Sequence, residues 1–347
     1  MRSSTSSITL TASSTSTGCP RWISCAASRT SSKRKRRPPS AKSAPRVVFL
    51  GTPLFATYSL RALARLAARG VIDIAAVITR ADKPGSRGRA SPRPVADVAR
   101  ELGLPVHSDL PAARGAAPDL LVWAAYGRKI PPDLLAVRYG GVNVHASLLP
   151  RWRGPAPIQA AILAGDEETG VTLMQADAGI DTGPLLASRR TAISPYDDAM
   201  SLEIRLGELG ADLLEEALPK YLAGELSAVP QDESRATWSH RLTTAESVLD
   251  FTKPARANWR LVRAAVPRPV ARTFWRGEPL LVWHARVSDK AEPREPGRLW
   301  LCGDEVCVDT AERLFIPQMV QPAGKRKMSA PDWARGARLE DRAHLPS

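Results

Sequence analysis

The feature that most constrains the fold is an apolar strand–helix–strand pattern near residue 50. Residues 46–50 form a short apolar run, and Gly51-Thr52-Pro53 follows it as a turn signal. Leu, Ala and Phe then recur at helical spacing over 54–69, and residues 71–79 are again β-branched and apolar. A strand, a helix and a second strand in succession are typical of a parallel sheet. We therefore predict an α/β fold with a doubly wound, mostly parallel sheet.

This alternation continues to about residue 223, where the chain changes character. After a predicted helix at 254–266, short strands separated by turns predict a small β-barrel. The polar, aperiodic stretch 230–252 is predicted to link the two parts. The other predicted helices are 94–102, 155–164 and 199–223, and the other predicted strands are 120–125, 141–145, 170–176, 280–287, 297–301, 305–309 and 313–318.

The first 45 residues differ from the rest of the chain. They contain 19 Ser and Thr, nine Lys and Arg, and no acid, and the first acid is Asp73. The whole chain carries a net charge of +14, and without this segment 40 basic residues face 35 acids, which leaves +5. Such a composition predicts disorder. The segment fits an organellar transit peptide, a basic nuclear or nucleic-acid patch at 33–37, or upstream sequence included through a misplaced start.

Several function classes find no support in the sequence. No apolar run approaches the roughly 18–20 residues that a membrane span needs. The chain has no GxSxG, GxxxxGK[ST] or HExxH motif, and its Gly51-Thr52-Pro53 turn is not a GxGxxG dinucleotide fingerprint. The cysteines follow neither a metal-ligand spacing nor a dense disulfide framework, and we expect no metal site. They are Cys19, Cys25, Cys302 and Cys307.

Residues 141–186 hold the side chains best suited to catalysis. Asn143 and His145 stand two positions apart near the end of a predicted strand, so their side chains point to one face. Ligand sites in open parallel sheets lie beyond the carboxyl ends of the strands. A His beside an Asn there can stabilise a developing oxyanion and handle a proton. Asp181 can orient the imidazole, and Asp177 is the rival carboxylate; a structural His near a turn Asp is the alternative.

The motifs of this region are similar to those of a known family. Residues 143–159 read NVHASLLPRWRGPAPIQ, and they are followed by GDEETGVT at 165–172 and DAGIDTG at 177–183. This combination resembles the signature of the formyltransferases that use 10-formyltetrahydrofolate. Three further segments resemble the branch of that family that acts on methionyl-tRNA: VFLGTP at 48–53, ADKPGSRGR at 81–89 and QPAGKRKMSA at 321–330.

The resemblance implies roles for individual residues. Asn143 and His145 would bind the formyl oxygen as its carbon becomes tetrahedral, and Asp181 would support protonated His145 and help to relay the proton. The co-substrate would be 10-formyltetrahydrofolate. The implied cofactor-binding residues are Ser147, Leu148, Leu149 and Pro150. The implied tRNA-binding residues are Lys83, Arg87 and Arg89 in a basic loop, and Lys325, Arg326 and Lys327 near the C-terminus.

The resemblance also implies the organisation and the reaction. We predict a disordered extension at 1–45, a formyltransferase catalytic domain at 46–229, a linker at 230–252 and an OB-like tRNA-binding domain at 253–340. The expected enzyme formylates the α-amino group of methionine on initiator methionyl-tRNA for translation initiation. We expect a monomer without a membrane partner, in the bacterial cytoplasm, or in an organelle matrix if the extension is a transit peptide.

Three alternatives stay open. A sugar-nucleotide N-formyltransferase would keep the same triad but would not need the 81–89 loop or the late basic motif. A 10-formyltetrahydrofolate hydrolase would release formate without an amine acceptor. A nucleic-acid-binding protein with an inactive catalytic domain would not require Asn143, His145 and Asp181, so their presence argues against it.

Overall fold

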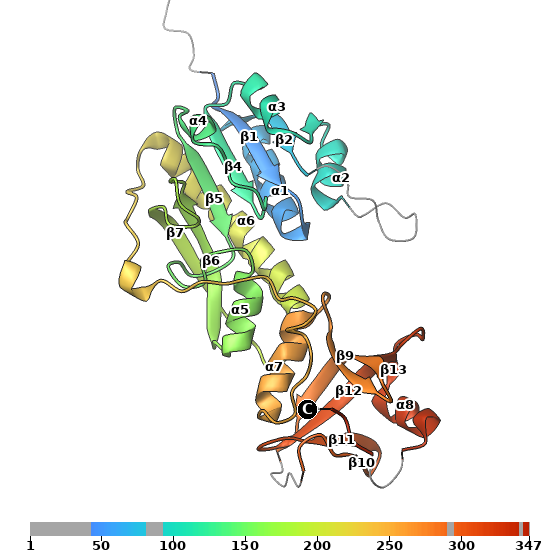
Figure 1. Ribbon diagram of the computed structural model, residues 1–347. Coiled ribbons are helices and arrows are strands. Elements are labelled where there is room, and N and C mark those ends of the chain that lie inside the picture. The colour runs from blue at the N-terminus through green and yellow to red at the C-terminus, as the bar shows by residue number, and fades with distance from the viewer. Residues whose placement is uncertain (1–42, 81–92, 290–294, 340–342, 347) are drawn as a thin grey trace, which may run out of the picture. The chain divides into compact units, whose positions relative to one another are not determined.

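The computed structural model describes residues 43–80, 93–289, 295–339 and 343–346 (Figure 1). Almost all of the predicted extension at 1–45 lies outside the described residues, as do Lys83, Arg87 and Arg89 of the predicted tRNA-binding loop. None of the described helices is both long enough and apolar enough to cross a membrane.

The N-terminal part is built on a seven-stranded sheet with the order β3-β2-β1-β4-β5-β6-β7 (Figure 1). The first five strands pair in parallel, whereas β6 runs antiparallel to both β5 and β7. The chain fills one side of β1 with β2 and β3 and then crosses to β4 on the other side. This confirms the predicted doubly wound, mostly parallel sheet. The strands are β1 (Arg46–Gly51), β2 (Asp73–Ile78), β3 (Val106–His107), β4 (Leu120–Ala124), β5 (Gly141–His145), β6 (Glu168–Gln175) and β7 (Leu185–Ala192).

Helices cover both faces of this sheet because both faces are apolar. In β1, Val47 and Phe49 join the core formed with α1, α2 and α6, whereas Val48 and Leu50 join the core formed with α3 and α4. Alternate residues of a strand point to opposite faces, so one apolar run serves two layers. The helices are α1 (Leu54–Ala68), α2 (Pro94–Glu101), α3 (Leu110–Gly115), α4 (Pro132–Leu135), α5 (Pro157–Ala164) and α6 (Ala199–Ala223).

The C-terminal part is an antiparallel sheet with the order β10-β11-β12-β9-β8, and β13 pairs with β12. Helices α7 (Ala255–Ala265) and α8 (Ala330–Ala337) pack on it, and Phe251 and Phe315 meet in its core with ring centroids 5.8 Å apart. No strand pair among the described residues closes this sheet into a full barrel, and the sheet is consistent with an OB-like domain. The strands are β8 (Ala271–Trp275), β9 (Glu278–Val287), β10 (Leu299–Cys302), β11 (Glu305–Asp309), β12 (Leu314–Pro322) and β13 (Met328–Ser329).

Some helices and strands of the structure have no clear pattern in the sequence. Strand β7 lies at the edge of its sheet and carries Arg189 and Arg190, so it lacks the apolar run that marks a buried strand. Helix α8 is only eight residues long and begins where the Ser329 side chain accepts a hydrogen bond from the Asp332 backbone N–H. Strand β8 follows a proline-rich turn, and the sequence pattern does not predict it. Strands β7 and β8 pair with β6 and β9, and α8 packs on β11 and β12, so all three elements are held by contacts with their neighbours.

Candidate active site

A cavity of about 550 Å³ opens at the carboxyl ends of β1, β4 and β5. Its walls include Pro53 and Phe55 after β1 and Ile130 after β4, and Asn143, His145 and Asp181 also line it. The order of the sheet reverses between β1 and β4, which is where doubly wound sheets bind their ligands. A volume of this size suits a small organic ligand. The residues predicted to be catalytic therefore meet at the position that the fold favours for a site.

Asn143 and His145 are held by the regular structure of β5. The strand is paired on both sides: Asn143 lies opposite Trp123 of β4 and Met174 of β6, and His145 lies opposite Thr172. Both residues are buried, with 5% and 6% of their surface exposed. The ladder hydrogen bonds fix the backbone, so the two side chains share one face without further help.

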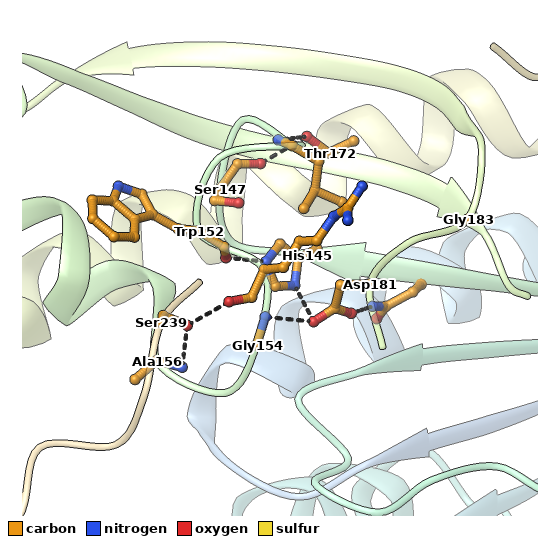
Figure 2. Close-up of polar contacts among 12 residues, drawn as sticks. His145, Ser147, Trp152, Gly154, Ala156, Thr172, Asp181, Gly183 and Ser239 are labelled. Carbon is orange, nitrogen blue, oxygen red and sulfur yellow. Dashed lines mark hydrogen bonds and ion pairs between the residues drawn. The ribbon is translucent and has the colours of Figure 1, made fainter. Parts of the chain in front are cut away.

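The carboxylate of Asp181 contacts both Asn143 and His145 of β5, and Figure 2 shows it beside His145. Asn143 Nδ2 donates to Asp181 Oδ1 at 3.0 Å, and His145 Nδ1 lies 3.6 Å from Asp181 Oδ2. The same Oδ2 accepts a hydrogen bond from the Gly154 backbone N–H at 2.9 Å. The other ring nitrogen of His145, Nε2, lies 2.9 Å from the Trp152 carbonyl oxygen. A carbonyl oxygen only accepts, so Nε2 carries hydrogen and Nδ1 is the nitrogen turned toward Asp181.

The rival carboxylate has a different environment. Asp177 is exposed and accepts hydrogen bonds from the Gly179 backbone N–H at 2.9 Å and from the Thr182 hydroxyl at 2.8 Å. These bonds close the turn in which it stands. The structure thus places Asp181, and not Asp177, beside His145.

A segment that the sequence predicts to be a plain linker completes the site. Residues 231–239, here called the crossing segment, run alongside the turn that follows β5 and form a parallel bridge between Arg153 and Trp238. Thr237 Oγ1 accepts from the Trp152 backbone N–H at 2.9 Å, and the Thr237 carbonyl accepts from Arg153 N–H at 2.9 Å. Ser239 Oγ donates to the Arg153 carbonyl at 2.9 Å and accepts from the Ala156 N–H at 3.1 Å (Figure 2).

Gly154 is required where the two segments approach most closely. It adopts φ +101°, and a Cβ placed on it would lie 2.6 Å from the Ser239 carbonyl oxygen. Only glycine combines this backbone conformation with so close an approach. The crossing segment has no apolar periodicity, so its polar residues carry no sequence signal of this contact.

The predicted folate-binding residues lie in the turn after β5, away from the walls of this cavity. The Ser147 side chain donates to the Arg151 carbonyl at 2.7 Å, and the Leu149 N–H donates to Thr172 Oγ1 at 3.2 Å. Ser147 and Leu149 are buried, and Leu148 lines a separate hollow beside Arg151. Neither these residues nor Pro150 is among the cavity-lining residues. Their predicted role in folate binding stays a prediction.

The described tRNA-binding candidates lie in the C-terminal part. Lys325, Arg326 and Lys327 are exposed on the turn between β12 and β13. Lys327 Nζ lies 3.1 Å from the centre of the Trp283 ring, so a cation–π contact holds this turn against β9. These three cations are well placed for contact with a polyanion, and their role stays a prediction.

The cavity wall also holds ionisable groups that the sequence analysis does not single out. Burial raises the pKa of Glu203 above its ordinary value, although a hydrogen bond from the Phe55 N–H opposes this rise. Burial likewise raises the pKa of Tyr126, and the positive charge of Arg128 opposes it. Both side chains line the cavity. Buried carboxyl and hydroxyl groups beside apolar walls provide hydrogen-bond partners for a ligand that is itself mostly apolar.

Together these groups are suited to acyl-type transfer. Asn143, and His145 when both of its ring nitrogens carry hydrogen, can direct hydrogen-bond donors at an oxygen that gains negative charge. Asp181 can hold the imidazole and balance its charge when it accepts a proton. The sequence predicts this trio, but the contributions of Gly154 and the crossing segment emerge only from the fold.

Comparison with protein families matches both parts of the chain. Residues 45–218 match the sequence model described as formyl transferase. Residues 241–338 match the model described as the C-terminal domain of formyl transferase.

Individual proteins give the same picture. The chain is 43% identical to a methionyl-tRNA formyltransferase of Roseiflexus sp. (strain RS-1), over 85% of this chain and 93% of that protein. It is 45% identical to a methionyl-tRNA formyltransferase of Methylococcus capsulatus, over 83% and 96% of the two chains. Among solved structures, HypX from Aquifex aeolicus in complex with tetrahydrofolic acid has a TM-score of 0.60 at 22% identity, over 85% of this chain and 48% of that one. At this identity the likeness concerns the fold.

Proposed function

This chain belongs to the formyl transferase family, and we propose that it formylates the α-amino group of methionine on initiator methionyl-tRNA, with 10-formyltetrahydrofolate as the formyl donor. The observation that carries the proposal is the cluster of Asn143, His145 and Asp181 in a cavity of about 550 Å³, in a chain whose relatives of 43% and 45% identity bear that name. The product serves translation initiation, and we place the enzyme in the bacterial cytoplasm.

The cavity fits such a donor in size and chemistry. Its walls combine apolar residues with a few convergent polar groups, as expected for a flat heteroaromatic ligand. When bound there, the folate supplies a formyl group whose oxygen gains negative charge as the amine attacks. Asn143 Nδ2, which has a second hydrogen beside the one given to Asp181, is one donor that we assign to this oxygen, and His145 Nδ1 is the other once it carries a proton. Removing one preorganised donor of this kind typically costs about 10²–10³ in rate.

His145 and Asp181 are the groups that we assign to proton handling. Nε2 is engaged by the Trp152 carbonyl oxygen, so Nδ1 is the ring nitrogen free to take or return a proton. Asp181 Oδ2 lies 3.6 Å from Nδ1, a distance that leaves room for adjustment or for a bridging water. The carboxylate balances the charge of the imidazolium that forms when the attacking amine loses its proton, and the imidazolium returns that proton to the folate nitrogen as the bond between this nitrogen and the formyl carbon breaks.

We assign the exposed cations near the C-terminus to the body of the tRNA. Lys325, Arg326 and Lys327 present three positive charges on one turn, and phosphate contacts of this kind position a nucleic acid without reading its sequence. Replacing all three with Ala should raise the KM for tRNA about tenfold at physiological salt, reduce its salt dependence and leave kcat unchanged. Lys220→Ala, which removes an exposed cation from α6, is the matched control. An unchanged KM in the triple variant would refute the assignment.

The direct test of the function uses the full chain with 10-formyltetrahydrofolate and initiator tRNA charged with methionine. Formation of formylmethionyl-tRNA is followed, with uncharged tRNA, free methionine and a nucleotide-linked amino sugar as alternative acceptors. We expect transfer to the charged tRNA alone. Transfer to the amino sugar instead would identify a sugar N-formyltransferase, and formate release without an acceptor would identify a hydrolase.

A further inference from the structure

Arg153 forms an unusual buried link between the turn after β5 and the crossing segment. Its side chain is only 2% exposed, and it makes hydrogen bonds to two residues of that segment. Nη1 and Nη2 donate to the two carboxylate oxygens of Glu233 at 2.8 and 2.6 Å, and Nε and Nη2 donate to Gln231 Oε1 at 3.1 and 2.8 Å. The Glu233 hydrogen bond raises the pKa of Arg153. The guanidinium thus stays charged and holds Gln231 in one orientation.

Gln231 passes this constraint on to the loop that carries Asp181. Because its Oε1 faces Arg153, its Nε2 points the other way and donates to the carbonyl oxygens of Asp181 at 2.9 Å and Gly183 at 2.7 Å. Both hydrogens of the amide are used, on two carbonyls that flank Thr182. The amide therefore clamps the backbone of this loop at two points.

The backbone at Asp181 needs such a clamp. Asp181 adopts φ +53°, in the left-handed region that residues with a Cβ rarely occupy. No strand ladder holds it, since it stands between the ends of β6 and β7. A relaxed backbone there would swing the carboxylate away from His145 and from the Gly154 N–H.

We propose that Gln231, oriented by Arg153, is a positioning residue for catalysis: it fixes the strained backbone of Asp181 so that the carboxylate faces His145. This rests on the proposed function, since it concerns the same site. It also gives the crossing segment a role in turnover, although none of its residues needs to touch a substrate.

Gln231 is the residue to replace in the test. Removing Arg153 would take a large buried side chain and its hydrogen bonds to Gln231 and Glu233 out of the turn, which would destabilise the fold itself. Gln231→Met keeps the length of the side chain and removes its hydrogen bonds. Asn258→Leu is the matched control, because the buried Asn258 amide also bridges backbone groups, donating to the Asp250 carbonyl at 2.8 Å and accepting from the Asp250 N–H at 3.0 Å. The control removes similar bonds in the C-terminal part.

The kinetic readout is a double-mutant cycle with Asp181→Asn. In the wild-type background we expect Gln231→Met to lower kcat about tenfold or more with KM values changed less than threefold. In the Asp181→Asn background the same substitution should lower kcat less than twofold, because the carboxylate that it positions is already gone. Asn258→Leu should leave kcat unchanged in both backgrounds. Equal losses from Gln231→Met in both backgrounds would overturn the proposal.

A second readout does not depend on the proposed reaction. The protein has five histidines, so the imidazole NMR signals of His145 can be assigned by their loss in His145→Ala. Gln231→Met should move these signals toward their positions in Asp181→Asn, whereas Asn258→Leu should not. If the wild-type protein fails to formylate any acceptor, the proposed function fails while this measurement still decides the clamp. Unmoved His145 signals in Gln231→Met would refute it.

Discussion

The two sides of the candidate triad are held in opposite ways. Asn143 and His145 stand near the carboxyl end of β5, where the ladder pairs Asn143 with both β4 and β6 and pairs His145 with β6. Asp181 stands in a turn with φ +53°, where contacts from the crossing segment and the Gly154 N–H hold it. The strand positions Asn143 and His145 through its own backbone geometry and its pairing with neighbouring strands. The turn obtains the same precision from distant residues: Gln231 lies 50 positions further along the chain, and Gly154 lies 27 positions before Asp181.

This difference separates two kinds of change to the site. A substitution on β5 removes a chemical group and leaves the geometry of the rest intact. A substitution that loosens the turn leaves every chemical group in place and disturbs their alignment. Removing a chemical group should therefore lower kcat more than misaligning one. The effect of misalignment on kcat should depend on whether the Asp181 carboxylate is present.

The largest loss of kcat is expected from removing His145, the proton acceptor on β5. His145→Ala should lower kcat by about 10³ or more, because the variant loses both a donor to the developing oxyanion and the group that accepts a proton. Binding of initiator tRNA, measured by filter retention, should stay within twofold of wild type. Unfolding should also be cooperative and close to wild type, since β5 keeps its ladder. Near-normal turnover would remove His145 from the mechanism.

Asp181→Asn should give the next largest effect. The Asn side chain can still accept the Gly154 hydrogen bond but no longer carries the charge that balances an imidazolium. We expect kcat to fall about 10²-fold, with the KM values changed little. Asp177→Asn is the control, because Asp177 bonds within its own turn. If the two variants lost the same activity, the geometric distinction between the carboxylates would be wrong.

The sequence predicts most of the elements that follow a strong local pattern. The apolar run at β1 and the spacing over α6 indicate both elements, and the ends of α6 are marked by a capping box at Asp198 and by Gly224 at φ +77°. Asn143 and His145 belong to this class, because a two-residue spacing on a strand already puts them on one face. The resemblance to a family adds Asp181 over Asp177, which spacing alone leaves open.

The remaining features depend on contacts between distant residues. Gln231 and Ser239 lie in a polar stretch without periodicity, and nothing local shows that it would run beside the turn after β5. In the sequence, Arg153 is one of several charged residues in a predicted loop. In the structure, its side chain is buried against Gln231 and Glu233. The requirement for glycine at 154 follows from the approach of Ser239 and not from a turn motif. Such features need the tertiary structure.

A smaller change, at Ser239, tests whether the crossing segment contributes to catalysis. Ser239→Ala removes the hydroxyl that donates to the Arg153 carbonyl and accepts from the Ala156 N–H. The carbonyl keeps the hydrogen bond from the Ser239 N–H at 2.7 Å, whereas the Ala156 N–H loses its hydroxyl partner. We expect a loss of about 1–3 kcal/mol in unfolding free energy and a fall of several-fold in kcat. Urea unfolding and initial rates measure the two quantities. Ser201→Ala, which removes a hydroxyl at the start of α6, should affect stability alone. If Ser239→Ala changed stability alone as well, the crossing segment would only support the fold.

The smallest effect concerns a carboxyl group in the cavity wall that, like His145, is carried by a regular element. Glu203 stands on α6, and burial raises its pKa above the ordinary 4.5. The folded state therefore holds its proton to higher pH than the unfolded chain does. The stability that this contributes is present below about pH 4.5 and is lost as the pH rises through the folded value.

Glu203→Gln keeps an oxygen for the Phe55 N–H and cannot ionise. The variant should therefore match wild type near pH 4 and exceed it by about 1–3 °C in Tm at pH 7.5. Thermal unfolding at the two pH values measures this difference. A Tm difference that does not change with pH would mean that Glu203 titrates alike in the folded and unfolded chains. The helix would then hold the carboxyl in contact with water, and the cavity wall at α6 would be more open than its burial indicates.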